Sequence, residues 1–108
     1  MRKCLSIDSK KKLTTEVLWI YILSLLSNKS MYAYEVKAEI EKNFSFAPAR
    51  ITSYIVLYNL EKGGYVTSEW EDSEHGRPNR KYYIITDSGK ELLKEGKSFI
   101  NLVISKIG

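Results

Sequence analysis

The chain has 108 residues and a formal net charge of +4, with 44% hydrophobic and 28% charged side chains. A chain of this length builds one domain with at most one appended element, and its composition is that of a folded protein rather than a disordered one. Its longest apolar run, residues 17–26, is about half of what a membrane span needs, so we expect no membrane segment.

The positive charge is concentrated at the N-terminus. Residues 1–13 hold five Lys and Arg against one acid, a difference that equals the whole net charge. Net charge is therefore a weak argument for nucleic-acid binding, which depends on where the cations lie. No apolar signal segment follows Arg2 and Lys3, and Cys4 is the only cysteine. We expect a cytoplasmic protein without disulfide chemistry.

The N-terminal third predicts a basic arm followed by a central helix. Residues 1–13 are polar and basic without periodicity, which indicates a flexible arm; a solvated tail with no role is an equal alternative. Thr14 is a suitable N-cap, and the following residues to Leu26 are apolar nearly all round. A helix with this pattern is expected at the centre of the fold.

Two further helices follow. In the second, Ala33, Val36, Ile40 and Phe44 form one apolar stripe opposite charged residues. The third is expected to begin near Pro48, since proline is tolerated at the first helical position, and to end at a left-handed cap supplied by residues 63–64, which are both glycine.

A β-hairpin is predicted next. Apolar and polar residues alternate from Tyr65 to Trp70, as in a half-buried strand. A polar loop extends from Glu71 to Asn79, and a second alternating strand runs over residues 80–86. The hairpin thus follows the third helix directly.

The chain closes with an amphipathic helix. Thr86 is a suitable N-cap, and Asp87 places a carboxylate in the first turn. Apolar residues recur every three to four positions along it. An apolar stripe on a terminal helix must be covered, most simply by a second copy of the chain. The candidate dimerisation residues are Leu92, Leu93, Gly96, Phe99, Ile100, Val103, Ile104 and Ile107.

Three helices followed by a hairpin form the layout of a winged helix-turn-helix, a mainly α fold with a small β-hairpin (α+β). We assign residues 14–86 to this DNA-binding domain and residues 87–108 to a dimerisation helix. In such folds the third helix lies in the major groove and the hairpin loop contacts the backbone or minor groove. Two copies would require an inverted-repeat operator.

The candidate contacts to double-stranded DNA come from the helix-turn-helix and from the loop. Cations around the rigid Pro78 suit phosphates, although an ordinary solvated turn is the alternative. Arg and hydroxyl groups of the third helix suit phosphates and base edges, although its apolar residues leave open that it is mostly core. The candidates are Tyr34, Arg50, Thr52, Ser53, Tyr54 and Tyr58 in the helices, and Arg77, Asn79, Arg80 and Lys81 in the loop.

Other functions are weighed against this hypothesis. The only histidine, His75, lies in the polar loop, and no nucleophile with a nearby base is suggested, so we expect neither an enzyme nor a cofactor or metal site. The acidic residues from Glu69 to Glu74 would point in different directions along a strand. A winged helix used for protein contacts is the more serious alternative, since the fold does not specify DNA. Trp19 and Trp70 could line a pocket for a small aromatic or hydrophobic effector, although core packing is favoured.

The motifs also carry a resemblance to a known family. They are Tyr32-Ala33-Tyr34-Glu35-Val36, Thr52-Ser53-Tyr54 with Leu57 and Leu60, Glu61 to Val66, Gly76-Arg77-Pro78 with Arg80-Lys81-Tyr82-Tyr83, and Thr86 with Gly89. Over about residues 13–90 the sequence resembles the PadR-like transcriptional regulators. This resemblance implies a dimeric prokaryotic regulator, usually a repressor, of the compact subgroup with one C-terminal helix. Ser53 and Ile55 depart from the Leu and Pro common in the family, which implies an operator of its own.

Overall fold

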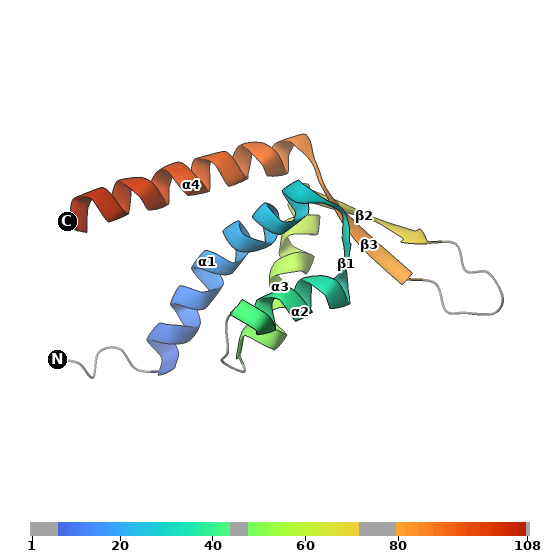
Figure 1. Cartoon of the computed structure of the whole chain (residues 1–108), viewed down its shortest axis with the longest axis horizontal. Coiled ribbons are helices and arrows are strands. Elements are labelled where there is room, and N and C mark those ends of the chain that lie inside the picture. Colours follow the sequence, from blue (N-terminus) through green and yellow to red (C-terminus); the bar gives the residue numbers. More distant parts are fainter. Residues whose placement is uncertain (1–6, 44–47, 72–79, 108) are drawn as a thin grey trace.

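The chain follows the predicted order of elements with one extra strand. The computed structural model describes the backbone of residues 7–43, 48–71 and 80–107, and the side chains of residues 17–43, 52–71 and 80–107. Figure 1 shows three helices, a hairpin and a last helix, with a short strand before the second helix. The elements are α1 (Ile7–Asn28), β1 (Met31–Tyr32), α2 (Ala33–Asn43), α3 (Pro48–Lys62), β2 (Val66–Glu71), β3 (Arg80–Ile85) and α4 (Asp87–Ile107).

Helix α1 begins earlier than the sequence analysis expected. It starts at Ile7, so the prediction of a flexible arm is wrong for residues 7–13, which are helical. Lysine and leucine are good helix formers, and a segment such as residues 10–13 can extend a helix that packing has already nucleated. Polarity without periodicity therefore did not exclude a helix here. Residues 1–6 lie outside the described part of the chain.

The centre of the core is formed by α1, as predicted from its all-round apolar sequence. This helix contacts α3, α4 and β3, which explains why its apolar residues are not confined to one stripe. Its buried leucine and isoleucine side chains pack against apolar residues of α2, α3 and the hairpin. The most deeply buried of these residues are Leu18, Ile22, Leu23, Val36, Ile40, Leu57 and Val66.

The strand β3 is the middle of a three-stranded antiparallel sheet with the order β1-β3-β2. The hairpin register pairs Val66 with Ile85 at one end and Glu71 with Arg80 at the other. The strand β1 was not predicted, because two residues are too few to show a period of two. It fixes the start of α2, where the N–H of Tyr32 donates to Oε1 of Glu35 at 2.9 Å, as in a capping box.

Helix α3 ends in a Schellman motif. The N–H of Tyr65 donates to the carbonyl of Leu60 at 2.9 Å, and the N–H of Gly64 donates to that of Glu61 at 3.0 Å. Gly64 has a φ of +84°, the left-handed conformation that glycine adopts without a steric penalty. The predicted glycine cap is confirmed.

Thr86 caps α4 and ties it to the end of α3. Its Oγ1 accepts a hydrogen bond from the N–H of Gly89 at 3.0 Å and donates one to the carbonyl of Gly64 at 2.8 Å. A Cβ atom on Gly89 would lie 2.0 Å from the carbonyl oxygen of Tyr65, so only glycine allows this close approach. The predicted N-cap is confirmed, and this junction sets the direction in which α4 leaves the domain.

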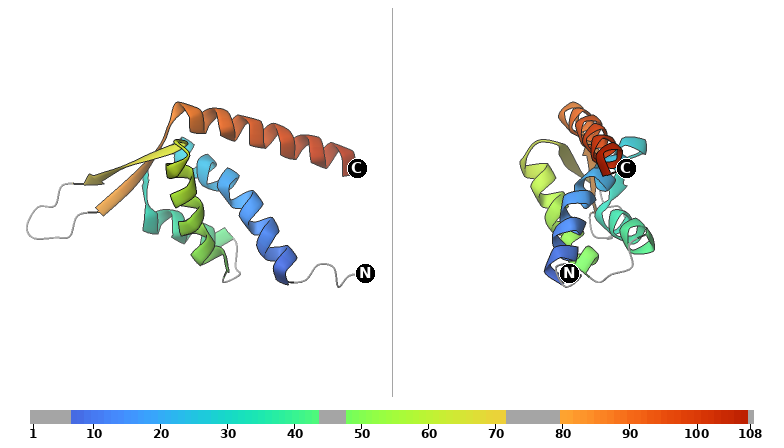
Figure 2. Two further views of the ribbon diagram at one scale, coloured as in Figure 1. Left: turned by 180° about the vertical axis from the view of Figure 1, so that it is seen from behind. Right: turned by 90° about the vertical axis from the view of Figure 1, so that its left-hand side faces the viewer.

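Helix α4 lies over α1 with its N-terminal half and extends away from the other elements with its C-terminal half (Figures 1 and 2). In the N-terminal half, Leu93 is only 6% exposed. A Cβ atom on Gly96 would lie 2.9 Å from the ring of Trp19 and 3.0 Å from Cγ1 of Ile20. The absence of a side chain at Gly96 therefore brings the two helices together.

Candidate nucleic-acid interface

Three large side chains, two of them aromatic, are exposed on the described part of α3. Tyr54, Ile55 and Tyr58 are 45%, 54% and 62% exposed and lie on one face, because residues four positions apart are neighbours on a helix. Tyr54 and Tyr58 were among the predicted DNA contacts, and their phenol groups are accessible. Ile55 was counted among the apolar residues that could make α3 mostly core, but its exposure makes it part of this face.

Two predicted contacts on α3 lie inside the protein instead. Thr52 is 7% exposed and Ser53 is fully buried. They belong to the stripe that also holds Val56, Leu57 and Leu60 and faces the core. The expectation rested on hydroxyl chemistry rather than on position around the helix, so both residues are removed from the candidate interface. The backbone of Arg50 lies in the first turn of α3, but its side chain is outside the described set.

Three tyrosines and one arginine gather where β1 and α2 meet the hairpin. The rings of Tyr32 and Tyr34 are stacked, with centroids 5.6 Å apart, and Tyr82 meets Tyr32 edge-on at 6.2 Å. The guanidinium of Arg80 lies over the Tyr32 ring, 4.4 Å from its centroid. Tyr34 remains 54% exposed, so its phenol faces outward beside Arg80. The pairing of β1 with β3 thus brings together two predicted contacts that are 46 residues apart in the chain.

Arg80 is held by the carboxylate opposite it on β2. Its Nε and Nη2 donate to Oε1 of Glu71 at 3.2 and 3.0 Å, and its Nη1 donates to Oη of Tyr34 at 3.5 Å. Oη of Tyr32 donates to the other oxygen of Glu71 at 2.6 Å. The hydrogen bond to Glu71 raises the pKa of both Tyr32 and Arg80, because it stabilises their protonated forms.

The other face of the hairpin joins α3 to the sheet. Lys81 lies 3.5 Å from Oε1 of Glu61, and the hydroxyl of Ser68 donates to the second oxygen of that carboxylate. The Nζ of Lys81 also lies 5.5 Å from the centroid of Tyr83 and 5.9 Å from that of Trp70. Lys81, a predicted DNA contact, therefore links α3 to β3. Two other predicted contacts, Arg77 and Asn79, lie outside the described residues.

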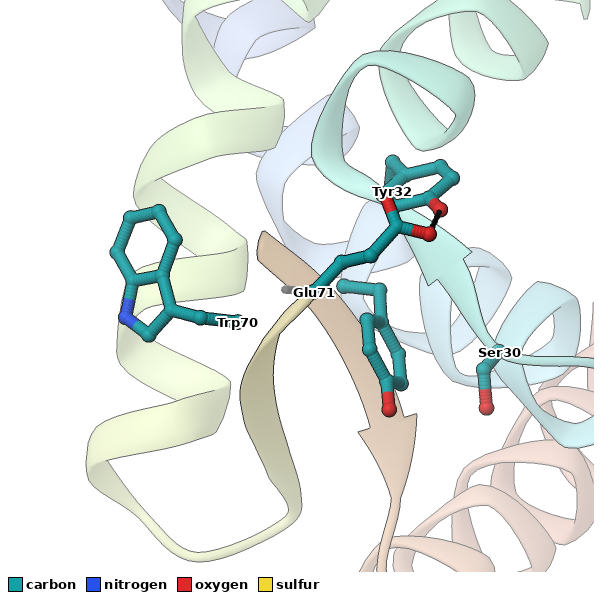
Figure 3. Close-up of a pocket in the computed structure, with 5 residues that line it drawn as sticks. Ser30, Tyr32, Trp70 and Glu71 are labelled. Carbon is teal, nitrogen blue, oxygen red and sulfur yellow. Dashed lines mark hydrogen bonds between the residues drawn. The ribbon is translucent and has the colours of Figure 1, made fainter. Parts of the chain in front are cut away.

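A polar hollow of about 490 Å³ lies beside the hairpin strands and is lined by Ser30, Tyr32, Trp70, Glu71 and Tyr82 (Figure 3). Figure 3 shows Tyr32 and Glu71 facing each other while Trp70 points away from them, to the opposite side of the hairpin. Trp19, by contrast, lines a groove between α1 and α4. The two tryptophans proposed to line one effector pocket are therefore in different places, and an effector remains a prediction.

The groove between α1 and α4 has a volume of about 460 Å³ and is mainly apolar. Leu93 and Gly96, two of the predicted dimerisation residues, face α1 within the same chain and are corrected to intrachain packing. Leu92 and Ile100 are half-buried. Leu102 was missed, although it lies three positions after Phe99 and is 51% exposed. The remaining predicted residues are exposed: Phe99, Val103, Ile104 and Ile107.

Two kinds of site are not found among the residues that the structure describes. The described side chains include no group of three or more His, Cys, Asp or Glu residues that could hold a metal ion. None of the helices in these ranges has both the length and the apolar character that crossing a bilayer demands.

The fold and the sequence both match known transcriptional regulators. A PadR-like regulator from Bacillus cereus has 31% identity and a TM-score of 0.71, with 84% of this chain and 87% of that chain covered. A PadR family regulator from Clostridium difficile has 28% identity and a TM-score of 0.70, with 84% and 97% covered. Bacillus subtilis PadR, solved in complex with operator DNA, has 25% identity and a TM-score of 0.63, with 73% of this chain and 45% of that chain covered.

The family assignment rests on the sequence as well. No protein of curated function matches the chain significantly. The sequence model of the transcriptional regulator PadR-like family matches residues 22–95, which span α2, α3, both hairpin strands and the capped start of α4. This confirms the resemblance inferred from the motifs and makes the protein a regulator rather than an enzyme. The chain belongs to the PadR-like family of transcriptional regulators.

Proposed function

We propose that the protein is a homodimeric repressor that binds an inverted-repeat operator, with α3 in the major groove and the hairpin against the backbone or minor groove. The observation that carries this proposal is the match to Bacillus subtilis PadR, a protein solved on operator DNA. A regulator of this kind acts where the chromosome is, so we place it in the cytoplasm with the nucleoid.

The exposed face of α3 is the proposed base-contacting surface. Tyr54 and Tyr58 present phenol groups that can donate to phosphates or base edges, and Ile55 offers an apolar contact for a thymine methyl group. Tyr34 and Arg80 form a proposed contact to the DNA backbone. Arg50, Lys81 and the loop residues Arg77 and Asn79 complete the proposed interface.

The second copy is proposed to cover α4. Phe99, Ile104 and Ile107 are each more than 60% exposed, and exposed apolar stripes of this kind are typical of interfaces. The α1–α4 groove lies next to this stripe, so one partner helix can cover both. Two DNA-binding units would then meet half-sites about one helical turn, or 34 Å, apart.

A protein-interaction module is the second candidate function. It is favoured by the apolar character of the α3 face and by the pairing of Arg80 and Lys81 with carboxylates. The two functions differ in salt dependence, because contacts to several phosphates weaken steeply as salt rises and an apolar protein interface does not.

Selection of duplexes from random DNA with the purified chain tests the proposal. We expect an enriched inverted repeat whose affinity falls by several orders of magnitude, about 10³-fold or more, between about 50 and 200 mM salt. Tyr58→Ala should weaken binding to the selected duplex by about tenfold or more. Tyr58→Phe then shows how much of that loss in affinity is due to the hydroxyl group alone. No enrichment, or enrichment without salt dependence, would favour the protein-interaction module instead.

A further inference from the structure

We propose that Glu71 is a built-in counterion for Arg80, which limits the attraction of the hairpin for DNA of any sequence. This inference rests on the proposed function, because it concerns how the same surface meets DNA. It assigns the acidic residue a role in setting the strength and the salt dependence of DNA binding. Glu71 itself need not touch the duplex.

The pair is built by the register of the hairpin. Glu71 and Arg80 are directly opposite each other in the last pair of the β2–β3 ladder, so both side chains lie on the same face. One carboxylate oxygen receives two N–H groups of the guanidinium, at 3.0 and 3.2 Å. The arrangement thus does not depend on long side chains meeting by chance across the surface.

The tyrosines hold both partners in place. The ring of Tyr32 lies under the guanidinium at 4.4 Å, while its hydroxyl donates to the second oxygen of Glu71 at 2.6 Å. Tyr34 accepts from the remaining guanidinium nitrogen at 3.5 Å. Arg80 is therefore confined by a carboxylate at one edge, a ring beneath and a phenol at its end.

The consequence for DNA follows from counterion release. An arginine adds to salt-dependent affinity because its phosphate contact releases a cation from the DNA. Arg80 already has an anionic partner, and its side chain is 47% exposed while that of Glu71 is 42% exposed, so both charges act on an approaching duplex. Its sequence-independent attraction is therefore smaller than that of a free arginine.

The neighbouring Glu69 provides a matched control. It lies two residues earlier on the same strand and the same face, and its Oε1 accepts from the hydroxyl of Tyr82 at 2.9 Å. Glu69→Gln and Glu71→Gln therefore remove the same charge from nearly the same place. Only Glu71→Gln removes the carboxylate that is paired with Arg80.

The test measures binding of the full chain to a random-sequence duplex and to the selected duplex over a range of salt concentrations. Glu71→Gln should tighten binding to the random duplex and steepen the plot of log affinity against log salt by up to about 0.9 for each protomer. That slope corresponds to up to about eightfold in affinity per tenfold dilution of salt. Because a phosphate contact acts on DNA of any sequence, binding to the selected duplex should tighten by a similar factor.

A double-mutant cycle identifies Arg80 as the mediator. In an Arg80→Gln background, Glu71→Gln should no longer exceed Glu69→Gln in its effect, since there is no guanidinium to release. Tyr32→Phe keeps the ring beneath Arg80 but removes the hydroxyl that holds Glu71, and it should shift the salt slope in the same direction by a smaller amount. Thermal unfolding of each variant shows whether the fold is intact. If Glu71→Gln is unfolded, the salt slope of Tyr32→Phe tests the proposal in its place.

The outcomes distinguish a failure of the counterion role from a failure of the proposed function. If the wild-type chain binds DNA but Glu71→Gln weakens binding, equals Glu69→Gln, or keeps its full effect without Arg80, the counterion role is overturned and the proposed function stands. If the wild-type chain shows no salt-dependent affinity for either duplex, the proposed function fails, and this inference fails with it.

Discussion

The two halves of α4 have the same apolar periodicity but different surroundings. The N-terminal half begins at the Thr86 cap and packs Leu93 and Gly96 against α1. The C-terminal half leaves Phe99 and Ile107 at 64% and 76% exposure. An apolar stripe in a sequence shows that a face must be covered, but not which chain covers it. The comparison predicts that substitutions in the first half change the stability of the chain, and that substitutions in the second half change its assembly.

Phe99→Glu should give the largest effect. A charge in the stripe opposes burial against a second copy, so the chain should become monomeric. Its affinity for an inverted repeat should fall by about 100-fold or more, because two linked DNA-binding units bind the repeat far more tightly than one unit does. Because Phe99 is exposed within the single chain, the monomeric variant should still fold and unfold cooperatively, and it should lose only the stability that the partner subunit supplied. Light scattering gives the mass. Asn101→Glu adds the same charge to another exposed position of α4 and should remain dimeric.

Gly89→Ala should destabilise the chain itself by about 2 to 3 kcal/mol, because the new Cβ would lie 2.0 Å from the backbone oxygen of Tyr65, which cannot move aside independently. Urea unfolding measures the change. Ser88→Ala, at an exposed neighbouring position, should stay within about 0.5 kcal/mol of the wild type. Equal stability of Gly89→Ala and Ser88→Ala would show that the junction between α3 and α4 is less tightly packed than the structure indicates.

Thr86→Val should have a smaller effect, a loss of about 1 kcal/mol in unfolding free energy. The substitution keeps the shape of the side chain but removes the acceptor for the N–H of Gly89 and the donor to the carbonyl of Gly64. Thr67→Val makes the same change at an exposed position of β2 and serves as the reference in thermal unfolding. If Thr86→Val loses no more stability than Thr67→Val, the two hydrogen bonds of the Thr86 hydroxyl do not stabilise the start of α4.

The sequence predicted those features of the fold that depend on local chemistry. Pro48 and the glycines at 63 and 64 marked the ends of α3, and Thr86 marked the start of α4, because caps depend on a few adjacent residues. The strand β1 was missed because two residues carry no periodicity. Residues 7–13 were missed because helix propensity without an apolar stripe was taken as an absence of structure.

The candidate site was less predictable because it depends on which way each side chain faces. Thr52 and Ser53 have the chemistry of DNA contacts, but their positions place them in the core stripe of α3. Arg80 was predicted as a cation for phosphates. Its pairing with Glu71 follows from a strand register set by the length of the intervening loop, which the residue types alone do not disclose.

The mass of the complex between the chain and its selected duplex tests the central claim most directly. Sedimentation at saturating protein should give two chains on each inverted-repeat duplex, with no stable complex holding one. A saturated complex of one chain per duplex, or a wild-type chain that remains a monomer and leaves the duplex free at low salt, would contradict the account.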